Sequence, residues 1–459
     1  MRTTWTVKGR IRLRHGQSII SDSTAHGDVV NLPLVQVRVS ARQKVLGVWS
    51  PWNSWGATKA DIYGSFSITN EKDRDQRLFM VEVMFKNDKL KIYPENDGLM
   101  NYLLEKLTSL VPGGDIVEDV SEQILEQTSR LAFDVKWILV LQEDKNSASP
   151  HSAGTVDLGD IVFDLNSFSI FLANDVAVKH AITWFVYTEA IDLLKEAGAG
   201  FRDDRKPIAL KYPHNNKLIK DYVESSYCDP ANKVIFIIKN TQVDQFDIDA
   251  ILHELMHVWA YQHSKGEMGL AWQLAVHGST HTGRQEKTFV AFHEAFAEWA
   301  SNRLTEKLFQ ATSQVYGTYD DLGIPFTRAH LQSIGITSLS ELDHYEEGWM
   351  SIFNMLFAKR LHRFDLNGAD RYPADIFPPP LKKQCDPPFL DIQHILRVFN
   401  PQPQRGYKDY LRKEEMNLDS FLKRACDVLF PQNSQQMQDN YRRLLDPNET
   451  VQPQDLFCI

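Results

Sequence analysis

The segment HELMH, at residues 253–257, has the residue types and spacing of a metal-binding pair. On a helix, residues four apart lie on one face, so His253 and His257 can present two imidazoles to one ion. Because a helix has about 3.6 residues per turn, Glu254 is turned from His253 by about 100° and flanks that ion. Zinc-dependent hydrolysis needs three protein ligands, an open position for water and a carboxylate that takes its proton. The segment supplies two ligands and the carboxylate; the alternative is a pair of buried histidines without an ion.

A second helix, predicted at about residues 288–309, carries candidates for the missing ligand. Glu294 and Glu298 are four residues apart in FVAFHEAFAEWASNRL, with apolar side chains between them. Glu294 can complete the coordination of the ion. Glu298, one turn further on, can accept the free N–H of a ligand histidine, which fixes the tautomer and the direction of that ring.

The HExxH segment followed by a helix that reads EAFAEW is similar to the gluzincin metallopeptidases. The resemblance implies a zincin-like catalytic domain that cleaves peptide bonds with one zinc ion. It also implies that SSYCDPANKVIFIIKN is an edge strand that binds the substrate in an extended conformation. Carried over by position, the zinc ligands are His253, His257 and Glu294, the general base is Glu254, and the carboxylate behind a ligand histidine is Glu298.

The chain departs from that family at two points. Ala295 stands where glycine is frequent, and 36 residues separate His257 from Glu294, more than in many relatives. The metzincin pattern is a rival, with His263 as third ligand. That pattern needs glycine at Ala260, where the helix must end, and alanine disfavours the left-handed turn. If the helix continues, His263 points away from the first two histidines.

Two further residues are candidates for stabilising the oxyanion of a tetrahedral intermediate. His344 and Tyr345 lie at the predicted start of a helix at about residues 341–362. Several gluzincins place a histidine or tyrosine on a later helix, and either side chain can donate a hydrogen bond to developing negative charge. The alternative is an ordinary surface helix start.

The N-terminal part has the pattern of a β-sandwich. Short segments alternate apolar and polar residues, as in TVKGRIRLR and LPLVQVRVSA. In ADIYGSFSI, Asp61, Gly64 and Phe66 form a turn followed by a strand, with Phe66 in the core. This motif resembles the transthyretin-like or carboxypeptidase-regulatory-like sandwich family. The segment VDLGDIVF at 156–163 is similar to the closing strand of that family. The resemblance implies a sandwich over residues 1–165, with a helical insertion at about 97–128.

Three tryptophans cluster in WSPWNSWG: Trp49, Trp52 and Trp55. If exposed, they can stack on a sugar or bind a protein partner of the sandwich. The alternative is that their rings fold onto the sandwich itself.

After about residue 170 the apolar spacing becomes helical, interrupted by the strands PIALKYP and KVIFIIK. We assign residues 166–370 to the zincin-like catalytic domain. Residues 371–459 are expected to be a proline-rich connector followed by a helical C-terminal region. The predicted fold class is therefore α+β and multidomain: an antiparallel β-sandwich, a mainly helical metallopeptidase domain and a helical end.

Composition limits the remaining function classes. The 459 residues are 43% hydrophobic and 24% charged, with a net charge of −10 and no Lys/Arg run, so nucleic-acid binding is not expected. The N-terminus lacks the pattern of a signal peptide, and no apolar run has the length of a membrane span. The four cysteines are widely spaced and leave the compartment open.

The sequence thus predicts a zinc metallopeptidase that acts on a peptide or protein. The alternatives are a recognition protein with a non-catalytic zinc site and a zinc hydrolase of a non-peptide amide. A structural zinc is usually closed by four protein ligands and has no use for a glutamate at position 254.

Overall fold

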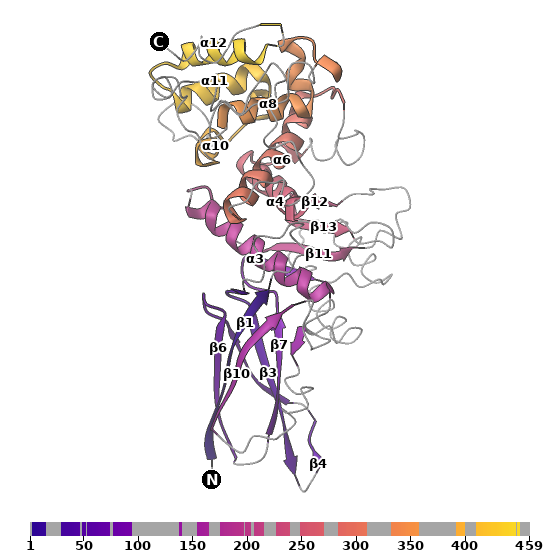
Figure 1. The fold of residues 1–459 in the computed structure, drawn as a ribbon, viewed down its shortest axis with the longest axis vertical. Coiled ribbons are helices and arrows are strands. Elements are labelled where there is room, and N and C mark those ends of the chain that lie inside the picture. The colour runs from indigo at the N-terminus through magenta and orange to yellow at the C-terminus, as the bar shows by residue number, and fades with distance from the viewer. Residues whose placement is uncertain are drawn as a thin grey trace. The chain divides into compact units, whose positions relative to one another are not determined.

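The structure is a computed structural model with mixed α and β elements in an α+β architecture (Figure 1). It describes residues 2–14, 29–45, 48–51, 53–73, 77–93, 137–139, 154–164, 175–196, 198–202, 206–214, 226–238, 248–269, 283–309, 332–357, 392–399, 410–446 and 448–449. The predicted insertion at 97–128 and the proline-rich connector at 372–389 lie outside these ranges.

The chain forms two compact units. The first comprises Met1–Thr188, Lys206–Ser225 and Phe236–Phe246, and the second comprises Glu189–Arg205, Ser226–Ile235 and Asp247–Ile459. Helix α3 (Asp175–Glu196) and strand β13 (Val234–Ile238) contribute residues to both. The domain boundary near residue 165 stays a prediction.

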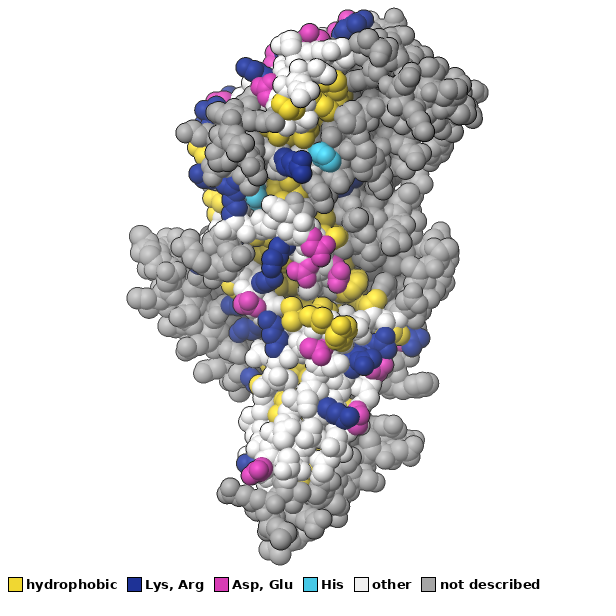
Figure 2. Space-filling model, turned by 90° about the vertical axis from the view of Figure 1, so that its left-hand side faces the viewer, with side chains coloured by type: hydrophobic (Ala, Val, Ile, Leu, Met, Phe, Trp, Pro, Cys, Tyr) yellow, Lys and Arg dark blue, Asp and Glu magenta, His cyan; other side chains and the backbone are white. Residues whose placement is uncertain are grey.

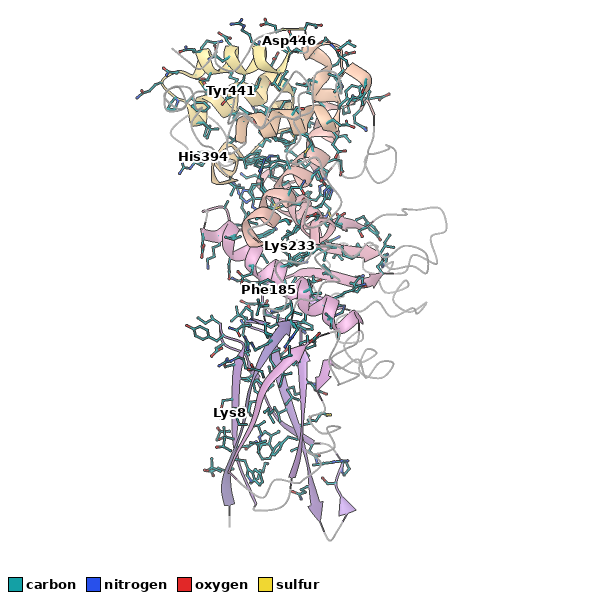
Figure 3. The ribbon with its side chains drawn as sticks, in the orientation of Figure 1. Lys8, Phe185, Lys233, His394, Tyr441 and Asp446 are labelled. Carbon is teal, nitrogen blue, oxygen red and sulfur yellow. The ribbon has the colours of Figure 1, made fainter. Side chains whose placement is uncertain are left out.

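The first sheet of the N-terminal unit is built around β1 (Arg2–Arg14). Strand β10 (Gly154–Phe163) pairs with β1 in parallel, whereas β6 (Ser65–Asp73) and β2 (Val29–Asn31) pair with it antiparallel (Figure 1). The predicted alternation in β1 is confirmed, because its apolar side chains are buried while Lys8 is exposed and forms an ion pair with Asp157 at 2.9 Å (Figure 3). The buried side chains of β1 are Trp5, Val7, Ile11 and Leu13.

The second sheet is antiparallel and has β3 (Gln36–Val45) at its centre. β7 (Arg77–Met84) pairs along one edge of β3, and β9 (Trp137–Leu139) follows β7. β5 (Asn53–Lys59) and β4 (Val48–Trp49) pair with β3 as well. The other sheet has the order β12-β13-β11-β8, in which β12 is Tyr227–Asp229, β11 is Ile208–His214 and β8 is Leu90–Tyr93.

Trp55 belongs to the apolar core of the N-terminal unit. Its ring is edge-on to Trp5, with centroids 6.5 Å apart, and to Phe79 at 5.2 Å. The interpretation of an exposed tryptophan cluster is therefore wrong for Trp55, which packs within its own unit. Trp52 and the side chain of Trp49 lie outside the described residues.

The turn before β6 forms as the sequence predicts. Asp61 Oδ1 accepts hydrogen bonds from the backbone N–H groups of Tyr63 and Ser65, both at 2.8 Å. Gly64 has φ +72°, and a Cβ there would lie 2.4 Å from the carbonyl oxygen of Ile11. The turn therefore requires glycine for both its conformation and its close approach to β1.

Helix α3 packs in the N-terminal unit through polar as well as apolar contacts. Trp184 donates from Nε1 to the carbonyl of Pro33 at 2.8 Å, and fully buried His180 donates from Nε2 to the carbonyl of Tyr212 at 2.6 Å. A carbonyl accepts only, so the proton of His180 is on Nε2.

The second unit is mainly helical. Its described helices surround a core of contacting aromatic rings: Phe292, Phe296, Trp349, Phe353, Phe399 and Phe421. The helices are α4 (Ile248–His263), α6 (Thr288–Phe309), α8 (Glu346–Phe357), α10 (Ile392–Phe399), α11 (Leu418–Leu429) and α12 (Ser434–Leu445), with short 3₁₀ helices at Leu339–His344 and Lys413–Glu415.

Arg424 of α11 connects α10 with the 3₁₀ helix at Lys413–Glu415 through buried hydrogen bonds. Its guanidinium is fully buried and donates from Nη1 to Glu415 Oε2 at 2.8 Å and from Nε to the carbonyl of Val398 at 2.7 Å. Tyr441 of α12, also buried, lies against Phe430 with ring centroids 6.3 Å apart (Figure 3).

On the face that Figure 2 shows, basic and acidic side chains are interspersed among the described residues. Within the described part of the chain, no helix is long and apolar enough to cross a membrane.

Candidate metal centre

Helix α4 places His253 and His257 side by side. Its buried stripe of Ile251, Leu255 and Val258 packs into the second unit, and this orients the remaining face of the helix. The imidazole centroids of the two histidines are 4.6 Å apart, and their Nε2 atoms are 2.9 Å apart. The i, i+4 spacing thus brings two ring nitrogens to one point, as the sequence predicts.

Helix α6 packs against α4 and brings Glu294 to the same point (Figure 1). Glu294 Oε2 lies 3.5 Å from His253 Nε2 and 3.3 Å from His257 Nε2. The ligand atoms of these three residues all lie within 4.8 Å of one another. The cluster of His253, His257 and Glu294 can therefore hold a metal ion.

The spacing of the three atoms can be compared with the geometry of a tetrahedral ion. Zinc bound at about 2.0 to 2.1 Å from each ligand keeps neighbouring ligands about 3.3 Å apart. The two distances to Glu294, 3.3 and 3.5 Å, match this value, and the distance between the two histidine nitrogens, 2.9 Å, is a few tenths shorter. Two imidazoles with one carboxylate are also a ligand set found at catalytic zinc sites, so the residues present fit the ion.

Glu298 lies one turn after Glu294 and contacts the far side of His253. Its Oε2 is 3.1 Å from His253 Nδ1, and its Oε1 accepts a hydrogen bond from Asn302 Nδ2 at 3.0 Å. A carboxylate can only accept here, so His253 carries a proton on Nδ1, and with an ion bound the lone pair of Nε2 would face that ion.

The carboxylates make this cluster favourable for positive charge. Burial alone lowers the pKa of His253, but its hydrogen bonds with Glu294 and Glu298 raise that pKa well above the ordinary value. Opposite charges within a few ångströms favour the charged form. The same carboxylates would favour a bound cation.

Glu254 is buried next to the cluster and contacts β12. Burial raises the pKa of its carboxyl group, whereas His257, His253 and a hydrogen bond from Cys228 act in the opposite direction. A raised pKa makes this carboxylate a stronger proton acceptor than an ordinary exposed one.

The sequence reasoning assigned no role to two residues that the structure brings to these carboxylates. Cys228 lies on β12, far from Glu254 in the sequence, and no local pattern indicated their contact. Asn302 could have been found, because it follows Glu298 by four residues on a predicted helix.

His263 is held elsewhere. Helix α4 continues through Ala260 to His263, whose Nε2 lies 3.2 Å from the carbonyl oxygen of Gly200. Its ring stacks on Trp259 with centroids 4.0 Å apart, and burial, together with Arg202, lowers its pKa to about 3. The structure thus groups Glu294, not His263, with His253 and His257.

His344 and Tyr345 follow each other at the junction between a 3₁₀ helix and α8. The ring of His344 donates from Nδ1 to the carbonyl of Gln285, and the backbone carbonyl of His344 accepts from the N–H of Gln285, both at 2.8 Å. These bonds attach His344 to the segment that leads into α6, and Tyr345 is largely buried. A role for either residue in stabilising an oxyanion stays a prediction.

Comparisons with protein-family models and with curated protein sequences found no match for this chain.

Proposed function

We propose that the protein is a zinc metallopeptidase of the gluzincin type, with an N-terminal transthyretin-like β-sandwich and a zincin-like catalytic domain. The observation that carries the proposal is the convergence of His253, His257 and Glu294, with Glu254 buried beside them. We assign the three convergent residues as zinc ligands, because their donor types and spacing fit a tetrahedral ion.

In the proposed reaction, the metal ion, Glu254 and Glu298 have separate roles. A zinc ion at the cluster supplies Lewis acidity, which polarises a carbonyl and makes a water molecule nucleophilic at neutral pH. Glu254 accepts a proton from the attacking water and later delivers it to the leaving amine. Glu298 keeps the proton of His253 on Nδ1, so that Nε2 remains a ligand.

The number of convergent ligands supports a catalytic site over a purely structural one. Three convergent ligands leave one position of a tetrahedral ion open, whereas a structural zinc is closed by four. Of the segment predicted as an edge strand, β13 lies inside the sheet between β12 and β11. β12 lies at its edge in contact with α4, where an extended peptide could add to the sheet. We therefore propose a peptide or protein substrate.

The test is a chelation experiment on the full-length protein. Peptide cleavage should be lost when a chelator removes the metal, and about one zinc per chain should restore it, because there is one site of three ligands. Metal content is measured at each step. Cleavage that continues after the zinc has been shown to be gone would contradict the proposal.

A further inference from the structure

Asn302 is buried directly behind the carboxylate of Glu298. Its side chain is 1% exposed and donates from Nδ2 to Glu298 Oε1 at 3.0 Å. The other oxygen of the same carboxylate, Oε2, lies 3.1 Å from His253 Nδ1. Glu298 is therefore held at both oxygens, by the imidazole on one side and by the amide on the other.

The carbonyl oxygen of the Asn302 side chain, Oδ1, is buried and lacks a hydrogen bond among the described residues. A buried acceptor without a partner costs free energy, so this asparagine does not improve the stability of the fold at that end. The reverse orientation of the amide would place Oδ1 against Glu298 Oε1, and two acceptors repel. The contact with Glu298 therefore sets the direction of the amide.

We propose that Asn302 is a positioning residue for the metal centre, acting through Glu298 to hold the ring of His253 in its ligating orientation. The inference rests on the proposed function for the identity of the ion as zinc. It extends the line of contacts from Nδ1 of His253 through Glu298 to Asn302, one turn further along α6.

The physical reason is the freedom that the carboxylate would otherwise have. The side chain of Glu298 is 14% exposed, so water can reach it, and its terminal torsion is soft. With Asn302 in place, the plane of the carboxylate is fixed and Oε2 remains directed at His253 Nδ1. Groups behind a metal ligand typically contribute about 10 to 100-fold in metal affinity. Asn302 acts through such a group, so we expect a smaller effect, roughly 3 to 10-fold.

The experiment measures zinc affinity by competition with a chromogenic chelator, and the thermal midpoint of the metal-free protein. Asn302→Leu keeps the approximate shape of the side chain without its donor, and Asn302→Ala removes both. Both variants should bind zinc roughly 3 to 10-fold more weakly. The metal-free protein with leucine should unfold near the wild-type temperature, because the substitution removes an unsatisfied buried acceptor as well as the donor to Glu298 Oε1.

A double-mutant cycle with Glu298→Ala distinguishes positioning from packing. If Asn302 acts through Glu298, Asn302→Leu should have no further effect on zinc affinity once Glu298 has been replaced. Wild-type affinity in Asn302→Leu, or an equal loss with and without Glu298, would overturn the proposal. A wild-type chain that binds no zinc would instead overturn the proposed function, and this inference with it.

Discussion

At the scale of single residues, Glu294 decides which kind of site this is. It lies 3.3 Å from one histidine nitrogen and 3.5 Å from the other, so it can supply the third donor that the proposed catalytic zinc needs. His263, the rival in the sequence, instead contacts Gly200 and Trp259. The rejection of His263 depends on Ala260, which continues the helix where the rival pattern requires a turn.

Replacing Glu294 by alanine should weaken zinc binding by more than about 100-fold, beyond the scale of a residue that only contacts a ligand. Two imidazoles would remain, and a cluster with two ligands holds zinc poorly. The matched control is His263→Gln, which keeps a donor near the Gly200 carbonyl and should retain about one zinc per chain. Metal analysis after dialysis against limiting zinc compares the two. Full zinc in Glu294→Ala would show that the ligand set has been assigned wrongly.

At the scale of elements, local patterns predicted more than long-range pairings did. The alternation of Val7, Ile11 and Leu13 predicted β1 because side chains of a strand point to opposite faces. The turn at Gly64 and the helices α4 and α6 followed from equally local signals. The i, i+4 spacings on α4 and α6 also predicted which side chains share a face, which is why the metal cluster could be anticipated.

The parallel pairing of β1 with β10 and of β8 with β11 had no local signal. These strands are separated by more than a hundred residues, and their register depends on packing across the unit. The contact between Cys228 and Glu254 also had no local signal, because it joins β12 to α4 and strand β13 lies between these two elements in the chain. Such contacts follow from the three-dimensional arrangement and not from periodicity.

The contact between α3 and β11 predicts a pH dependence of stability. Burial lowers the pKa of His180 to about 4, although its bond to the carbonyl of Tyr212 partly opposes the shift. In the unfolded chain the pKa of histidine is about 6.5, so the unfolded state binds more protons between these two values. Stability should therefore fall as the pH decreases from about 6.5 to about 4, by up to about 3 kcal/mol from this residue.

The measurement is the free energy of unfolding in urea, followed at pH 7.5 and at pH 4.5. His180→Gln is the control, because glutamine keeps an N–H donor for Tyr212 and has no charge to gain. The wild type should lose more stability than the variant over this interval. Equal losses would mean that His180 is not held neutral by the fold.

At the scale of the whole molecule, the candidate metal cluster lies in one of the two compact units. Among the described residues, the group of three side chains that can hold a metal lies on α4 and α6 of the mainly helical unit. The described strands of the N-terminal unit provide a buried aromatic core and exposed ion pairs such as Lys8–Asp157. The proposed catalysis therefore belongs to the helical unit, and recognition of a partner stays the predicted role of the sandwich.

The most direct test of the account compares wild type with Glu254→Gln in the cleavage of a mixed peptide library, with zinc measured in both proteins. Glutamine keeps the size of the side chain and the three ligands but cannot accept the proton from water. The variant should retain about one zinc per chain and lose about 10² to 10⁴-fold in cleavage rate. Equal cleavage by the two proteins would contradict Glu254 as the base. A zinc-loaded wild type that cleaves no peptide would contradict the peptidase itself, leaving a zinc-bearing recognition protein or a hydrolase of another amide.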